Sequence, residues 1–313
     1  MTSTSSQHLL GVLGIVIAAI LWGTTGTAAT FAPGVGPLAI GAAAMGIGGL
    51  LQTLIAWRGI QRGRSALLGQ ARHLLLGGVA VAIYPLAFYS SMDLAGVAIG
   101  TVVTIGSAPL LSALIEWQLD NLRLTRRWFA GSTIGLLGMA LLCFTSQHGS
   151  GVSEDAAHVL PGILAGLVAG LSYAVYSWAA RRIMQSGVQS SVAMGAIFGL
   201  GGALLMPVLF VTGGPFLESW RNFNVGVYMA LVPMFIGYVC FGFGLARVRA
   251  SAATTITLLE PVVAAILAIA IVGEMLSPTG WAGVALIITS LVVITAPIPS
   301  RPRFRVFRTV KTG

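Results

Sequence analysis

Long apolar runs separated by short polar connections fill the chain from residue 9 to residue 297. A helix that spans the hydrocarbon core of a bilayer needs about 20 predominantly apolar residues. Ten runs meet this requirement, so the pattern predicts ten membrane-spanning helices. The predicted spans are residues 9–31, 36–57, 73–92, 96–116, 128–147, 160–180, 190–212, 224–245, 251–272 and 279–297.

The placement of basic residues supports ten spans. With this count, the 17 Lys and Arg residues divide between the two sides of the membrane as 16 to 1, and only Arg221 falls on the minor side. A missed or extra helix would scramble that alternation. Because cytoplasmic connections carry the excess of Lys and Arg, both termini are predicted to be cytoplasmic in a multi-pass protein of the cell inner membrane.

The composition is that of a membrane protein. The chain is 56% hydrophobic and 8% charged, with a mean hydropathy of +0.92, whereas a soluble domain carries about 25% charged residues. The net charge of +9 does not predict nucleic-acid binding, because the basic residues mark the ends of apolar runs and form no groove. The 41 glycines suit helices that pack closely in lipid.

The two halves of the chain resemble each other. A shift of 152 residues superposes Pro109 on Pro261, and a shift of 151 puts the run Gly11–Trp22 on Gly162–Tyr173. Chance similarity between apolar helices is the alternative, but matched proline and glycine positions make chance less favoured than matched Leu or Val would. The sequence therefore predicts an internal repeat.

The repeat defines the predicted domains and the fold class. Residues 1–150 form a first five-helix repeat, residues 151–298 a second, and residues 299–313 a basic cytoplasmic tail. Because five is odd, the second repeat enters the membrane from the opposite face. The prediction is an all-α polytopic membrane protein of two inverted-topology repeats. Many secondary transporters have this architecture, with the substrate near the bilayer midplane between the repeats.

Landmarks along the chain resemble the EamA-type repeat of the drug/metabolite transporter superfamily. They are the opening LWGTTG (Leu21–Gly26), Pro261 followed by the Gly273–Glu274 pair, and the Trp281–Gly283 start of the last span. The resemblance covers nearly the whole chain as two tandem repeats. Within the superfamily, the chain looks most like the YddG-type aromatic amino-acid exporters. The resemblance implies a secondary transporter that needs no cofactor.

One position departs from the family pattern. The glutamate that follows the proline of the repeat by 13 residues is Glu274 in the second half, but Leu122 stands there in the first half. The nearby acids, Glu116 and Asp120, are out of register. No role is therefore carried onto the first half, and Glu274, at a membrane boundary, is expected to be structural.

Glu260 is the acidic residue that the sequence places deep in a span. It lies nine residues beyond Ser251, where the ninth span begins, which is about 14 Å into a core of about 30 Å. An ionisable group at that depth is costly and by default marks a substrate or ion pathway. Two functional roles fit, a proton that exchanges with substrate or a partner for a substrate ammonium. A protonated glutamate that donates one interhelical hydrogen bond is the structural alternative.

Aromatic residues with polar groups also lie deep in spans. Trp22, Tyr84, Tyr173 and Tyr238 are far from the headgroups, so their polar groups need partners within the protein. They predict a shared aromatic cavity, and hydrogen bonding between helices in a dry core is the alternative. The candidate substrate-binding residues are Trp22, Thr25, Tyr84, Ser107, Tyr173, Tyr176, Tyr238 and Glu260.

Several prolines lie within predicted spans, where each removes a backbone donor and tends to kink its helix. Such a kink is either static packing or a hinge for gating. Pro261 cannot donate to the carbonyl of Thr257, and the kink is predicted to leave that carbonyl free to line a cavity beside Glu260. The candidate hinge residues are Pro85, Pro109, Pro233 and Pro261.

Other functions fit the sequence less well. A membrane enzyme would need clustered His, Asp or Glu, and a channel would need a ring of like residues at a constriction. No metal site, cofactor or GxxxxGK[ST] segment for ATP is predicted. The prediction is a secondary transporter that exports amino acids, aromatic and other large apolar ones, by alternating access, with a proton as candidate coupling ion. A lipophilic cationic drug is the alternative substrate, held by cation–π contacts and Glu260.

Overall fold

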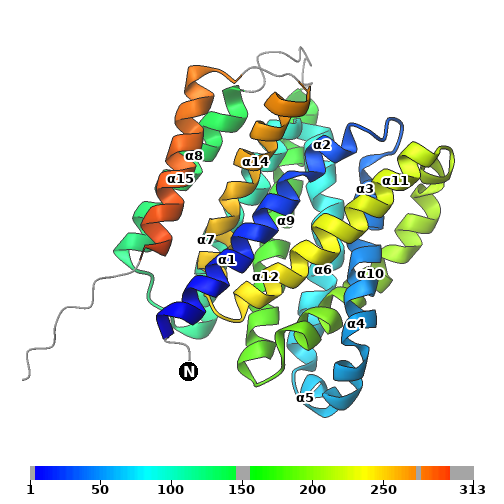
Figure 1. Cartoon of the computed structure of the whole chain (residues 1–313), viewed down its shortest axis with the longest axis vertical. Coiled ribbons are helices and arrows are strands. Elements are labelled where there is room, and N and C mark those ends of the chain that lie inside the picture. Colours follow the sequence, from blue (N-terminus) through cyan, green and yellow to red (C-terminus); the bar gives the residue numbers. More distant parts are fainter. Residues whose placement is uncertain (1–3, 146–155, 273–275, 297–313) are drawn as a thin grey trace, which may run out of the picture.

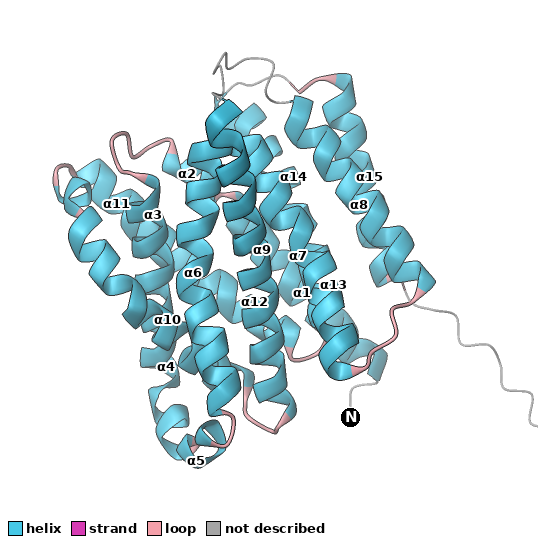
Figure 2. Cartoon of the chain, turned by 180° about the vertical axis from the view of Figure 1, so that it is seen from behind, coloured by secondary structure: helices cyan, strands magenta, loops and turns pink. Residues whose placement is uncertain are grey.

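The computed structural model describes residues 4–145, 156–272 and 276–296, and these residues form helices and short connections without a strand. The helices run side by side as one bundle (Figure 1). Figure 2 shows the same bundle from behind. Gly273, Glu274, the boundary at residues 150 and 151, and the tail from residue 299 lie outside the described residues.

Regular helices alternate with short 3₁₀- and π-helical segments. The first half contains α1 Thr4–Gly23, α2 Thr25–Ala29, α3 Pro37–Gly41, the π segment η1 Ala42–Ile47, α4 Gly48–Arg62, α5 Arg64–Leu68, α6 Ala71–Ala95, α7 Val97–Asp120 and α8 Arg126–Thr145. The second half contains α9 Ala156–Gln185, α10 Ser190–Thr212, the 3₁₀ segment η3 Gly214–Leu217, α11 Trp220–Met229, the π segment η4 Ala230–Ile236, α12 Gly237–Leu245, α13 Ala250–Ile256, the 3₁₀ segment η5 Thr257–Leu259, α14 Glu260–Leu267, the π segment η6 Ala268–Val272 and α15 Pro278–Thr295.

Each predicted span coincides with a helix or with a series of joined segments. Among the described residues, nine helices are long and apolar enough to cross a membrane. The helix outside this set is α8, which coincides with the predicted fifth span and starts with Arg126 and Arg127. The all-helical membrane fold is therefore confirmed, whereas the count of ten stays a prediction.

Local sequence explains several helix boundaries. Gly96 joins α6 to α7 with a φ of 82°, a conformation that side chains disfavour. Asn121 ends α7 in the left-handed region, which asparagine tolerates well. Ser219 caps α11 and Ser277 caps α15, in each case by accepting a backbone N–H three residues on.

Helices α8 and α15, which coincide with the last predicted span of each half, lie side by side at one edge of the bundle (Figures 1 and 2). Glycines bring their backbones together, since a Cβ atom on Gly138 would stand only 2.7 Å from the carbonyl oxygen of Gly283. The Ser290 hydroxyl donates to the carbonyl of Gly131 at 2.7 Å. Such small-residue contacts are how helices associate where lipid removes the hydrophobic driving force.

The start of α1 and the end of α15 lie at the same end of the bundle (Figure 1). The α4–α6, α7–α8, α9–α10 and α12–α13 connections lie at this end as well (Figures 1 and 2). An even number of crossings places both ends of a chain on one side, so this arrangement agrees with the predicted alternation. The side of the membrane that this end faces stays a prediction.

A buried carboxylate ties the two halves together at that end. Glu116 of α7 is 1% exposed. It accepts the backbone N–H of Ala250 at 2.8 Å and the hydroxyl of Ser251, both at the start of α13. Nearby, the Arg181 guanidinium of α9 donates to the carbonyls of Leu245 and Val248. Glu116 thus acts as an N-cap for α13 supplied from the other half.

We expect reporter insertions on either side of α10 to decide whether α8 crosses the membrane. Alkaline phosphatase, active only outside the cytoplasm, should be inactive after Gly187 and active after Gly214. If α8 does not cross, these two results will be reversed, while an insertion after Gly63 should stay inactive in either case because it precedes α8.

We expect Glu116→Ala to destabilise the fold by about 2–3 kcal/mol, because it leaves buried donors of α13 unpaired. The measurement is the thermal midpoint of the purified protein in detergent. Glu116→Gln, which keeps one acceptor oxygen, should fall between Ala and the wild type. Glu218→Ala is the matched control because Glu218 is exposed. If Glu116→Ala and Glu218→Ala have the same thermal midpoint, Glu116 does not have this role.

Candidate functional site

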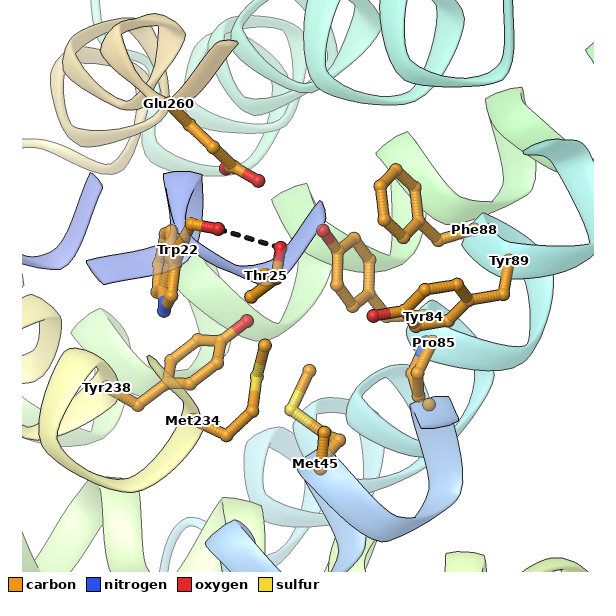
Figure 3. A pocket seen from close by; sticks show the side chains of 12 residues that line it. Trp22, Thr25, Met45, Tyr84, Pro85, Phe88, Tyr89, Met234, Tyr238 and Glu260 are labelled. Atoms are coloured by element: carbon orange, nitrogen blue, oxygen red, sulfur yellow. Dashed lines mark hydrogen bonds between the residues drawn. The ribbon is translucent and has the colours of Figure 1, made fainter. Parts of the chain in front are cut away.

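A pocket lies inside the bundle between the two halves (Figure 3). Its walls come from α1, α2, α3, η1 and α6 of the first half and from η4, α12 and α14 of the second half. The lining residues are Trp22, Thr25, Gly41, Ala44, Met45, Tyr84, Pro85, Phe88, Tyr89, Met234, Tyr238 and Glu260. The wall is therefore mostly aromatic and apolar, with a few oxygen atoms and one carboxylate.

Interrupted helices line much of this pocket. Met45 belongs to the π segment η1, Met234 belongs to the π segment η4, and Glu260 follows the 3₁₀ segment η5. Pro233 within η4 cannot donate a backbone hydrogen bond, which favours a departure from the regular α-helix there. Irregular helical turns of this kind frequently occur at functional sites.

Trp22 forms one wall of the pocket and is 4% exposed. Its indole N–H donates to the carbonyl of Pro233 at 2.9 Å. Its ring packs on Tyr238 with the ring centroids 4.6 Å apart. A Cβ atom on Gly237 would stand 2.7 Å from the indole nitrogen, so the close approach of α1 and α12 depends on glycine there. Trp22 thus presents its ring to the pocket, while its indole N–H is already hydrogen-bonded to Pro233.

Two tyrosines next to the pocket have hydroxyls that form hydrogen bonds with other side-chain hydroxyls. The hydroxyls of Tyr176 and Tyr238 lie 2.8 Å apart, and those of Tyr173 and Thr257 lie 3.0 Å apart. Tyr173 and Tyr176 are fully buried and support the ring of Tyr84 at centroid distances of 5.6 and 5.8 Å. These two tyrosines belong to the same aromatic cluster as the pocket but do not line it.

Glu260 is the first residue of α14, directly after the 3₁₀ turn. Figure 3 shows its carboxylate directed into the pocket. Within the part of the chain that the structure describes, this carboxylate has no hydrogen-bond or ion-pair partner. The Thr257 carbonyl was predicted to be free beside it, which is wrong, because it accepts the backbone N–H of Glu260 in the 3₁₀ turn.

The other predicted residues occupy different positions. Thr25 lines the pocket, although its hydroxyl donates back to the carbonyl of Trp22 at 2.7 Å (Figure 3). Ser107 does not line the pocket, and its hydroxyl donates to the carbonyl of Thr104 at 3.2 Å. Serine and threonine hydroxyls commonly bond to their own helix in this way.

The predicted hinge prolines differ in their surroundings. Pro85 and Pro109 lie within the uninterrupted helices α6 and α7, and Pro85 also lines the pocket. Pro233 lies in the π segment η4, and Pro261 follows the 3₁₀ turn η5. Of the four candidate hinge prolines, Pro233 and Pro261 are therefore the two that lie at irregular helical turns.

The sequence prediction did not include Tyr89, Phe88, Met45, Met234, Gly41 and Ala44, which also line the pocket. Tyr89 lies near the end of the predicted third span, where interfacial tyrosines are common. The other residues are apolar and do not stand out in apolar runs. Only the packing of the helices identifies them.

The pocket is narrow in this conformation. Its free volume is about 20 Å³, which is room for about one water molecule. An amino acid or a drug-sized cation is far larger. The side chains around the pocket must therefore separate before a substrate of either kind can bind.

Comparison with known proteins identifies the class of the chain. The EamA-like transporter family matches twice, at residues 9–144 and 160–296, which fits a two-repeat architecture. The uncharacterized transporter YwfM of Bacillus subtilis (strain 168) is 34% identical over 285 residues, which is 91% of this chain and 93% of that protein.

Two further similarities extend this comparison. A probable terminal-alkyne amino-acid exporter of Streptantibioticus cattleyicolor is 27% identical over 64% of each chain. A solved crystal structure superposes with a TM-score of 0.74 and 25% identity, over 93% of this chain and 96% of the other. The family predicted from the sequence is confirmed, and the protein is a transporter rather than an enzyme. With two family matches that together cover most of its length, this chain belongs to the EamA-like transporter family of the drug/metabolite transporter superfamily.

Proposed function

We propose that this transporter exports amino acids with large apolar side chains, aromatic ones included, across the cell inner membrane by alternating access. The observation that carries the proposal is the carboxylate of Glu260, which faces an aromatic pocket between the two halves without a partner among the described residues. A small-molecule substrate follows from the family, whereas the amino acid, the inner membrane and cytoplasmic termini belong to the proposal.

The unpaired carboxylate argues for a ligand. A charged or polar group inside a membrane protein is costly unless it is paired. A purely structural Glu260 would need a hydrogen bond across helices, and the described residues supply none. A substrate ammonium would provide the missing partner through a charge-assisted hydrogen bond. The second possible role of this carboxyl is to carry a coupling proton. The Glu260→Gln variant described below distinguishes the two roles.

The apolar wall argues for a large side chain. Met45 and Met234 stand next to each other between Tyr238 and the other two tyrosines of the pocket (Figure 3). Methionine adapts its shape to different apolar partners, and the rings of Trp22 and Tyr238 offer faces for aromatic or aliphatic groups. The likeness to a probable terminal-alkyne amino-acid exporter supports an amino acid as the substrate class.

Alternating access follows from where the walls come from. Both halves of the chain contribute to the pocket, so a relative movement of the halves changes its width. The narrow free volume of about 20 Å³ supports a conformation closed around the site. The irregular turns at Pro233 and Pro261 are the proposed hinges, because their backbone already lacks regular α-helical hydrogen bonds.

A lipophilic cation is the second candidate substrate. No Arg, Lys or His is among the described residues that line the pocket, so nothing there repels a cation. Glu260 would supply the counter-charge, and the faces of Trp22, Tyr84 and Tyr238 would supply cation–π contacts.

We expect Glu260→Gln to weaken the apparent affinity for every amino acid alike by about tenfold or more, because the side chain keeps its shape but loses the charge that holds the ammonium. Counterflow of labelled phenylalanine into liposomes, competed by a panel of amino acids, measures this loss. Glu218→Gln, an exposed carboxylate, is the control.

The same variant separates the other roles of Glu260. If the carboxyl carries a coupling proton, the pH dependence should disappear while equilibrative exchange continues at an unchanged affinity. Wild-type affinity together with a wild-type pH profile would rule out both functional roles and leave the residue structural.

We expect Gly41→Ala to reduce transport of bulky substrates by about tenfold, because one methyl group of mismatch in an apolar pocket has that effect. The added Cβ atom would stand 2.8 Å from the Tyr89 ring and would push it into the pocket. Tryptophan transport should fall more than valine transport. Gly214→Ala, where the added atom meets open space, is the control, and equal rates in both variants would contradict this placement of the site.

A further inference from the structure

We propose that the hydroxyls of Tyr84 and Tyr89 bind the substrate carboxylate, and that Tyr89 thereby makes the transporter select amino acids over amines. This inference rests on the proposed function. Tyr84 and Tyr89 come from the same helix, α6, on either side of Pro85. Figure 3 shows both hydroxyls directed toward the space that Glu260 also faces.

Among the described residues that line the pocket, Tyr84 and Tyr89 are the tyrosines whose hydroxyls have no hydrogen-bond partner. The indole N–H of Trp22 donates to the carbonyl of Pro233, and the hydroxyl of Thr25 donates to the carbonyl of Trp22. The hydroxyl of Tyr238 has a partner in that of Tyr176 at 2.8 Å, and either of the two can be the donor. Tyr84 and Tyr89 make no hydrogen bond to any residue that the structure describes, and both side chains are only half-buried. A hydroxyl left unpaired inside a membrane protein is costly, so these two are expected to serve a ligand.

Charge balance identifies the ligand group. A zwitterionic amino acid whose ammonium pairs with Glu260 still carries a carboxylate, and the described pocket lining holds no cation for it. Neutral donors must then satisfy that carboxylate, because an unpaired charge away from water is costly. Phenolic O–H groups form short, charge-assisted bonds to carboxylates. An amine without a carboxylate needs no such donors, so the two hydroxyls separate the two candidate substrate classes.

Packing fixes both rings independently of their hydroxyls. The Tyr89 ring contacts Phe88, with the centroids 5.2 Å apart, and lies against the backbone of Gly41. The Tyr84 ring stacks on Phe88, with the ring centroids 5.7 Å apart, and also contacts the ring of Tyr173. Replacing either tyrosine by phenylalanine therefore removes a donor and leaves the ring in place. This makes the substitution a direct test of the hydroxyl.

The test compares phenylalanine with phenethylamine, which has the same ring and ammonium but no carboxylate. Liposomes with purified protein are assayed for counterflow of each labelled compound. In Tyr89→Phe, the apparent affinity for phenylalanine should fall about 10- to 100-fold, whereas that for phenethylamine should change less than about twofold. Tyr84→Phe should act in the same direction. Tyr228→Phe is the control, because this hydroxyl bonds Thr24 outside the pocket lining.

Each result has a separate meaning. Equal losses for both compounds in Tyr89→Phe, or no loss for either, would overturn the carboxylate subsite and leave the proposed function standing. A wild-type protein that prefers phenethylamine would overturn the subsite and favour the lipophilic cation. A wild-type protein that moves neither compound would overturn the proposed function together with this inference. Folding is measured separately as the thermal midpoint of each purified variant in detergent, which should equal that of the wild type because the phenylalanine ring keeps the packing of the tyrosine ring.

Discussion

The requirement that a polar group inside a bilayer finds its partner within the protein governs this structure. Two glutamates show its two consequences. Glu116 meets the requirement with donors from the start of α13, and the result is a fixed link between the halves. Glu260 has no such donors among the described residues and faces a pocket instead. The same side chain is a structural cap in one place and a candidate ligand group in the other, and the difference lies in its neighbours.

The same requirement explains the backbone around the pocket. Pro233 and Pro261 cannot complete an α-helical hydrogen-bonding pattern, and the chain responds with π and 3₁₀ turns. The Pro233 carbonyl accepts the indole N–H of Trp22, and the Thr257 carbonyl accepts the N–H of Glu260. At each irregular turn a carbonyl therefore has a donor, and the bond helps to hold Trp22 or Glu260 at the pocket. The irregular backbone and the pocket-lining side chains coincide here because the backbone fixes where those side chains lie.

The sequence allowed the membrane helices and part of the pocket to be predicted, for a physical reason. Apolar runs of span length and a lone deep carboxylate stand out against their surroundings, as Glu260, Trp22 and Tyr238 do. Met45 and Met234 do not stand out, because an apolar residue in an apolar run carries no signal of which neighbour it faces. Tyr173 and Tyr176 are also deep in their spans, yet their hydroxyls form hydrogen bonds with Thr257 and Tyr238 and do not line the pocket. Depth is readable from the sequence, whereas hydrogen-bond pairing depends on how helices pack.

The narrow pocket links binding to movement. Its free volume of about 20 Å³ leaves little empty space between the side chains that line it, which keeps their dispersion contacts. A substrate side chain must replace those contacts, and it can do so without loss because rings and thioethers accept other apolar partners equally well. Under the proposed function, the Glu260 carboxylate gains a partner when the substrate ammonium binds. Because the pocket wall belongs to both halves, a substrate that binds there as proposed would also set the distance between the two halves.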